Sequence, residues 1–297
     1  DYASLDAYTE EMIQIERENR KARMSNIEMT DSSEIGILAN QDVETHVNES
    51  SDLLEEYNDM LFYFEAHGYN IYLPYDIFVE AYSQGEYDDV YEFIESRIVS
   101  SDVSTYTNAL AVKWYDNIGT VEKPSMLPHT ADYSRYNIRD VVVKGDIIYE
   151  DAGGITEITG HIAIVQGKFY DVSCSMYYIR TIEANLAGVV YGAFDDDRLD
   201  DKASKVYRVT TATDTHINGA VQFCKDQIGD SYNLGVIISP SGYCNTLTSV
   251  NAWYCSELVW AGYYNAGINL DATSRPTNIY YPVMLAASNK LTRRTIS

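Results

Sequence analysis

The residues of this chain best suited to chemistry are a cysteine at the start of an apolar helix and a histidine at the start of an apolar strand. Cys255 lies in WYCSELVWAGYY (253–264), where a polar first turn precedes apolar residues at helical spacing. Unpaired backbone N–H groups and the macrodipole at a helix start favour a thiolate over a thiol. His161 opens the alternating strand in TGHIAIVQG (159–167). The pair predicts a cysteine nucleophile on a helix that faces a histidine base on a sheet.

These two residue types predict acyl transfer to sulfur. His161 would take the Cys255 proton, or hold it in a resting thiolate–imidazolium pair, and the thiolate would attack an amide carbonyl. The backbone N–H of Cys255 would help to bind the oxyanion. His161 would then protonate the leaving amine, and water would release the acyl enzyme. The expected activity is therefore that of a cysteine hydrolase.

The other cysteines show neither a disulfide framework nor the pattern of a metal site, although a bridge from Cys244 to Cys255 would abolish the nucleophile, so the enzymatic interpretation requires a reduced Cys255. The chain has four, at positions 174, 224, 244 and 255, with no CxxC pair and no Cys/His spacing typical of a zinc site. Cys224 lies on the apolar face of a predicted helix, which indicates a core position. The acidic run FDDDRLDD (194–201) does not have the spacing of a calcium loop, and a solvated turn between strands is the favoured interpretation. No metal and no other cofactor is expected.

Strand-like segments surround the histidine and would position it. KGDIIYED (144–151) enters a strand through a Gly-Asp turn, and the strand of His161 follows it as the next member of a hairpin or meander. Residues 180–192 and 205–210 are strand-like as well. These patterns predict an α+β domain with an antiparallel sheet and packed helices.

The order of these segments resembles the circularly permuted NlpC/p60-type cysteine peptidases of the papain fold, and most closely their YiiX/YebB-like branch. The resemblance rests on GDII, TGHIAIV, TIEA followed by GVVYG, a helix that ends in GDSYN, and YCSELVW. Histidine before cysteine is the reverse of the order in ordinary papain-like enzymes. The similarity covers roughly residues 138–292 and implies a permuted papain-like (NlpC-type) domain.

The resemblance also implies two further site residues. Glu183, in TIEA, matches the family's acidic position and would orient the histidine, and Tyr232, in GDSYN, matches a tyrosine that lines the substrate cleft. Asp171 is the local competitor for the acidic role, because it lies just beyond the histidine strand. The long gap from His161 to Glu183 and the extra loop at 239–252 depart from the family pattern. The first departure leaves the third catalytic residue open between the two acids, and Glu183 is favoured because its strand matches the family and would lie beside that of His161.

Peptidoglycan stem peptides or related small peptides are the substrates that the resemblance implies, in a secreted or cell-envelope protein of a bacterium whose signal segment is absent from this chain. One alternative is an acyltransferase or thioesterase-like enzyme that acts on lipid acyl groups. Another is a non-catalytic surface protein that binds cell wall, although the presence of Cys, His and an acid argues against it.

Charge divides the chain into two parts. Of the net charge of −24, residues 1–100 contribute −19 (24 acidic and 5 basic side chains) and the remainder −5 (21 acidic and 16 basic). Nucleic acid is not an expected partner, since phosphate binding needs clustered Lys and Arg. No apolar run approaches the roughly 20 residues that span a bilayer, so membrane insertion is not expected. We expect an acidic helical N-terminal region over residues 1–132 and the peptidase domain over residues 133–297.

Overall fold

The computed structural model describes residues 46–66, 69–85, 87, 90, 93–94, 131–151, 160–171, 175–201, 203–235, 251–271 and 280–297. The acidic segment before residue 46 and two of the four cysteines, Cys174 and Cys244, lie outside the described residues.

The centre of the fold is a six-stranded antiparallel sheet with the order β5-β4-β3-β2-β6-β9. The two longest strands, β3 and β4, form a hairpin that β5 extends, and the segment predicted at 180–192 therefore spans parts of two strands. A β-bulge between Val165 and Gly167 interrupts the β3–β4 pairing. The strands are β2 (Ile147–Glu150), β3 (His161–Asp171), β4 (Met176–Asn185), β5 (Gly188–Phe194), β6 (Lys205–Val209) and β9 (Leu291–Arg294).

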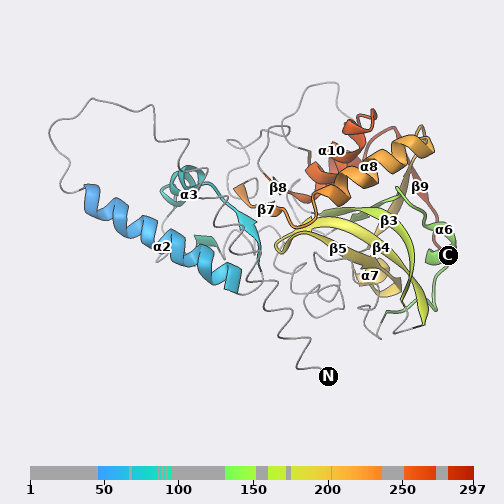
Figure 1. Cartoon of the computed structure of the whole chain (residues 1–297), viewed down its shortest axis with the longest axis horizontal. Helices are drawn as coiled ribbons and strands as arrows, with labels where there is room; N and C mark the ends of the chain where they lie inside the picture. Colours follow the sequence, from blue (N-terminus) through green and yellow to red (C-terminus); the bar gives the residue numbers. More distant parts are fainter. Residues whose placement is uncertain are drawn as a thin grey trace. The chain divides into compact units, whose positions relative to one another are not determined.

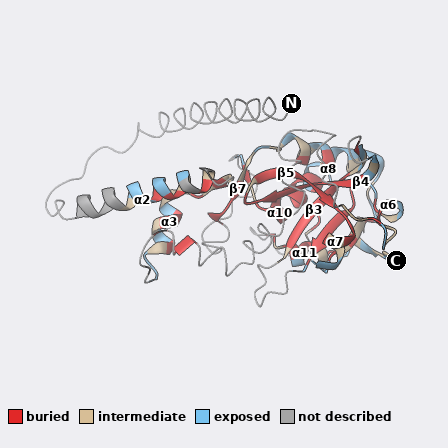
Figure 2. Cartoon of the chain, turned by 90° about the horizontal axis from the view of Figure 1, so that it is seen from below, coloured by how far each residue is buried: buried red, intermediate tan, exposed pale blue. Residues whose placement is uncertain are grey.

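Two helices pack against each other and against β3 and β4 of this sheet (Figure 1). They are α8 (Asp214–Asp226) and α10 (Cys255–Asn265). The Cys224 thiol, fully buried on α8, donates to the Leu258 carbonyl of α10 at 3.5 Å, so the predicted core position of Cys224 is confirmed. Buried residues concentrate on the sheet and on α10 (Figure 2). The short helices of this part are α6 (Ile138–Val141), α7 (Asp196–Asp201) and α11 (Pro282–Ala286).

The predicted Gly-Asp turn before β2 is hydrogen-bonded to both α10 and β6. Gly145 has φ +82°, a left-handed conformation that glycine adopts without a steric penalty, and its carbonyl accepts from the Tyr263 hydroxyl of α10. Asp146 is buried and accepts two hydrogen bonds of 2.7 Å from the guanidinium of Arg208 in β6. The turn thereby sets where β2 enters the sheet.

A second, smaller sheet leads into the region of the cysteine. It has the order β1-β7-β8 with parallel pairs, and its strands are β1 (Ile71–Tyr72), β7 (Ser231–Asn233) and β8 (Ala252–Trp253). β7 contains Tyr232, and β8 ends two residues before Cys255. The chain from 69 to 72 is thus paired with strands that adjoin the predicted site.

Ahead of β1 and directly after it lie two helices rich in aromatic side chains, α2 (His46–Ala66) and α3 (Tyr75–Tyr82). Tyr57 of α2 donates to the Leu73 carbonyl, and its ring lies 5.1 Å from that of Phe78 in α3. The α+β class with an antiparallel sheet and packed helices is confirmed, whereas the boundary predicted at 132/133 stays a prediction. In the described part of the chain, none of the helices combines the length and the apolar character that crossing a bilayer requires.

Asn70 provides a test of whether β1 unfolds together with the larger sheet. Its Nδ2 donates to the Gly229 carbonyl at 3.1 Å, and its Oδ1 accepts from the Ser231 hydroxyl at 2.9 Å. We expect Asn70→Ala to lower the free energy of unfolding by about 1 kcal/mol, because it removes the exposed hydrogen bond to Gly229 and the part-buried one from Ser231. Thermal melts followed by tryptophan fluorescence would measure the change.

Ser83→Ala is the matched control, since the Ser83 hydroxyl bonds only locally, to the Glu80 carbonyl at 2.9 Å. Equal melting midpoints for the two variants would show that β1 contributes little to the stability of the rest. That result would favour the boundary at 132/133.

Candidate active site

Cys255 is the first residue of α10, as the sequence predicts. The N-cap Tyr254 is extended (φ −98°, ψ 163°), and its hydroxyl accepts from the Tyr280 backbone N–H at 3.1 Å. The chain therefore enters the helix at a defined angle, with the Cys255 side chain 6% exposed. Backbone N–H groups in the first turn of a helix lack intrahelical partners, and their partial positive charge acts on the sulfur and on any oxyanion formed beside it.

His161 is the first residue of β3 and contacts both of its predicted partners. Its Nε2 lies 2.7 Å from Glu183 Oε2, and its ring is also hydrogen-bonded to the Cys255 side chain. Since Nε2 is bonded to the carboxylate, Nδ1 is the ring nitrogen left for the sulfur. The structure thus joins Cys255, His161 and Glu183 in one chain of side-chain contacts.

The charges around His161 favour its protonated form. Burial alone would lower the pKa of His161, but the hydrogen bonds to Cys255 and Glu183 and the negative charges on them raise it from 6.5 to about 9. An imidazolium at neutral pH is the state expected of a histidine that shares a proton with a cysteine.

Glu183 lies near the end of β4 and accepts hydrogen bonds from several donors. Thr181 Oγ1 donates to its Oε1 at 2.8 Å, and Arg198 donates to Oε1 at 2.9 Å and to Oε2 at 2.8 Å. Burial opposes ionisation, yet the charges of Arg198 and His161 and their hydrogen bonds hold the pKa of Glu183 well below its usual range. Glu183 therefore faces the histidine as a carboxylate.

Asp171, the competing acid, lies at the opposite end of β3. Ten residues of strand separate it from His161, a distance of roughly 30 Å at the usual rise per residue. The structure therefore places Asp171 beyond the reach of the imidazole.

Tyr232 is buried in β7, close enough to Cys255 for their charges to interact. Burial raises the pKa of Tyr232 well above its usual value, and a negative charge on Cys255 raises it further. The phenol therefore stays protonated and can serve as a hydrogen-bond donor beside the sulfur.

The first turn of α10 is less exposed than the sequence suggests. Ser256 and Glu257, which we interpreted as a polar helix start, are both buried. Burial raises the pKa of Glu257 to about 8, although its carboxyl group also accepts from the Tyr254 backbone N–H. Below that pH the neutral carboxyl group does not oppose a negative charge on the neighbouring Cys255.

Sequence reasoning missed Arg198, which lies within the acidic run 194–201. The structure shows neither a solvated turn nor a calcium loop there, but α7, with Asp196 and Arg198 buried. A lone arginine between aspartates, preceded by the apolar end of a strand, is the only sequence signal that could have identified it. Across the ranges described above, no three His, Cys, Asp or Glu side chains are arranged to hold a metal ion.

Comparison with known proteins agrees with this geometry. Residues 141–283 match the model of a family described as "Permuted papain-like amidase enzyme, YaeF/YiiX, C92 family". No curated protein and no solved structure matches the chain. The matched segment contains His161, Glu183, Tyr232 and Cys255. The predicted type, a permuted papain-like cysteine peptidase, is therefore confirmed for the segment that matches, and the matching model describes amidases of the C92 family and not NlpC/p60 itself.

Proposed function

We propose that this domain hydrolyses amide bonds in peptidoglycan stem peptides or related small peptides, with Cys255 as nucleophile, His161 as acid and base, and Glu183 as the orienting acid. The observation that carries the proposal is the continuous contact from Cys255 through His161 to Glu183, in which the histidine is charged and the acid is ionised. The corresponding cellular setting is secretion or the cell envelope of a bacterium.

The reaction begins with attack of the Cys255 sulfur on the amide carbonyl carbon. The backbone N–H of Cys255, at the positive end of α10, and the hydroxyl of Tyr232 supply donors for the oxyanion. His161 donates its proton to the leaving amine as the C–N bond breaks, which leaves a thioester on Cys255. Water, deprotonated by the neutral His161, then attacks the thioester; the C–S bond breaks, the acid is released, and the Cys255 thiolate is restored beside the His161 imidazolium.

Glu183 supports both proton transfers without contacting the substrate. Its bond to Nε2 fixes the ring so that Nδ1 faces the sulfur, and its negative charge stabilises the imidazolium.

The substrate proposal is tested with defined muropeptides. We expect the full chain to release new amino groups from stem peptides, measured by mass spectrometry, and Cys255→Ala to release none while melting at the wild-type temperature. Cleavage of acyl-lipids with no cleavage of muropeptides would contradict the substrate class and leave the cysteine chemistry intact. Activity in Cys255→Ala would overturn the nucleophile itself.

The pH dependence follows from the raised pKa of His161. The imidazolium must be present to protonate the leaving amine, and with a pKa of about 9 it is present through neutral pH and lost above it. We therefore expect kcat to decline as pH rises through about 9, rather than through the ordinary histidine value of about 6.5. A decline centred near 6.5 would show that Cys255 and Glu183 do not stabilise the charged ring.

The role of Glu183 is tested against that of Asp171. Glu183→Gln keeps the shape but loses the charge, and we expect kcat to fall by about 10²- to 10⁴-fold with little change in KM. Asp171→Asn, assayed on the same substrate, should stay within a few-fold of wild type. The reverse pattern would transfer the orienting role to Asp171.

A further inference from the structure

The site contains a buried arginine to which neither the sequence pattern nor the family description assigns a role. Arg198, 2% exposed in α7, reaches both oxygens of Glu183 through two parallel N–H groups of its guanidinium. We propose that Arg198 is a positioning residue of the active site, which keeps Glu183 ionised and turned toward His161. The inference rests on the proposed function of Glu183 as the orienting acid.

The bidentate contact leaves the carboxylate of Glu183 a single orientation. Oε2 accepts from both Arg198 and His161, and Oε1 accepts from Arg198 and Thr181. Gly192, on the neighbouring strand β5, provides the space that this arrangement needs. A Cβ at that position would lie 1.8 Å from Oε1, so any larger residue would displace the carboxylate. Two parallel N–H···O bonds fix the plane of a carboxylate, which a single contact cannot do.

The guanidinium is in turn held from three directions. Its Nε donates to Glu150 Oε1, and Nη1 donates to the Ala193 carbonyl at 2.9 Å in addition to Glu183. Glu150 lies directly opposite His161 in the β2–β3 pairing. Arg198 therefore connects the strand beside the histidine with the strand that contains the orienting acid.

The backbone that carries Arg198 is itself anchored at the start of α7. Asp195 precedes the helix and accepts from the Arg198 backbone N–H at 2.9 Å, as an N-cap residue does. Asp195 also accepts from the Asp132 backbone N–H at 3.2 Å, so the segment before α6 is joined to the same cap.

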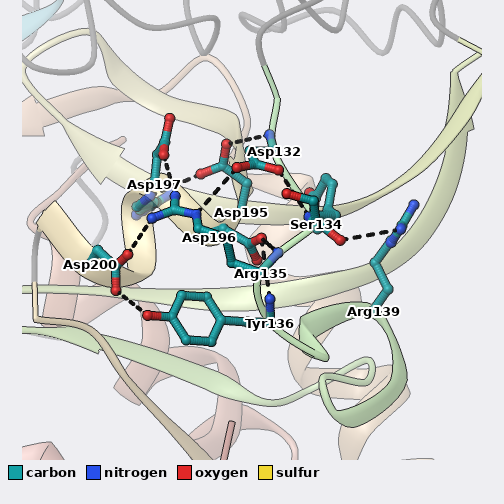
Figure 3. A network of polar contacts seen from close by, with 11 residues as sticks. Asp132, Ser134, Arg135, Tyr136, Arg139, Asp195, Asp196, Asp197 and Asp200 are labelled. Carbon is teal, nitrogen blue, oxygen red and sulfur yellow. Dashed lines mark hydrogen bonds and ion pairs between the residues drawn. The ribbon is translucent and has the colours of Figure 1, made fainter. Parts of the chain in front are cut away.

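That segment, residues 132–136, contacts the aspartates of α7 through hydrogen bonds and ion pairs (Figure 3). Asp196 accepts from the backbone N–H groups of Arg135 at 2.6 Å and Tyr136 at 3.3 Å. The Arg135 side chain binds Asp197 and Asp200. The aspartates of the run therefore have partners of their own, and Arg198 extends from a fixed helix into the site.

Removal of the Arg198 charge would change the protonation of the site. The carboxylate of Glu183 would then lie buried without its guanidinium partner, and burial drives such a group to take up a proton. A neutral Glu183 no longer stabilises the His161 imidazolium, so the charged Cys255–His161 pair becomes less favourable in acid.

The test is the rate at which iodoacetamide alkylates Cys255 in the full-length chain, measured by mass spectrometry between about pH 4.5 and 9. The acid limb is the part of this pH–rate profile in which alkylation slows as the pH falls. In Arg198→Met we expect the acid limb to move to higher pH by about one unit, so that the rate at a given pH on it is roughly tenfold lower. Arg198→Lys, which restores a charge but not the paired N–H groups, should move the limb less while its kcat on muropeptides still falls with KM near wild type.

Arg180→Met is the matched control. Arg180 is a second arginine that is 1% exposed, but its Nε donates to Gln166 at 2.6 Å and its guanidinium lies 3.5 Å from the Phe169 ring centre. We expect this variant to lower the melting temperature and to leave the alkylation limb in place. Glu150→Gln, which keeps an acceptor for Arg198, should also leave the limb in place.

A folded Arg198→Met with the wild-type limb would overturn the proposal, and so would an equal shift in Arg180→Met. If Arg198→Met does not fold, Arg198→Lys decides, and wild-type values for both its limb and its kcat would overturn the role. Alkylation needs no substrate, so the pH dependence of the alkylation rate can be interpreted even if muropeptides are not cleaved. The two proposals can therefore fail separately.

Discussion

A buried row of charged side chains constrains this fold more than any other interaction. His161, Glu183, Arg198 and Glu150 are each at most 7% exposed, and each contacts the next. A charge removed from water is costly unless it is paired and hydrogen-bonded. One of the four residues comes from each of strands β2, β3 and β4 and helix α7. Each buried charge therefore has its partner only when these four elements pack together. The same contacts that make burial tolerable also define the direction and charge of the imidazole.

The sheet and α10 bring the three residues proposed to react together in an order unrelated to that of the chain. His161 comes from the start of β3, Glu183 from the neighbouring strand, and Cys255 from the start of a helix packed on both strands. Catalysis depends on where the side chains meet, and not on which of them comes first along the chain. A histidine that precedes the cysteine can therefore serve the same chemistry as one that follows it.

The acidity of this chain is in part a structural feature of its interior. In the run 194–201, main-chain N–H groups bind the buried carboxylates of Asp195 and Asp196, which composition alone assigns to solvent. Asp197 and Asp200 stay at the surface, where they pair with Arg135. Asp195 and Asp196 are fully buried, and the helix that they begin presents Arg198 to the site. A run of like charges is read as solvated because repulsion usually exposes it, and here hydrogen bonds from a neighbouring segment allow two of its acids to be buried.

The sequence by itself determined the helix that begins at Cys255 and the strand that begins at His161, and with them two of the residues proposed to react. Helical spacing after Cys255 and strand alternation after His161 are local patterns, set by backbone geometry and by the burial of one face. The preference for Glu183 over Asp171 came from the family resemblance, and only the tertiary structure shows the contact, because it depends on strand pairing and on which end of β3 bears the histidine. The tertiary structure likewise determined the place of Arg198 beside Glu183 and the burial of Glu257. The position of Arg198 and the burial of Glu257 depend on contacts between residues far apart in the sequence, which composition and periodicity do not predict.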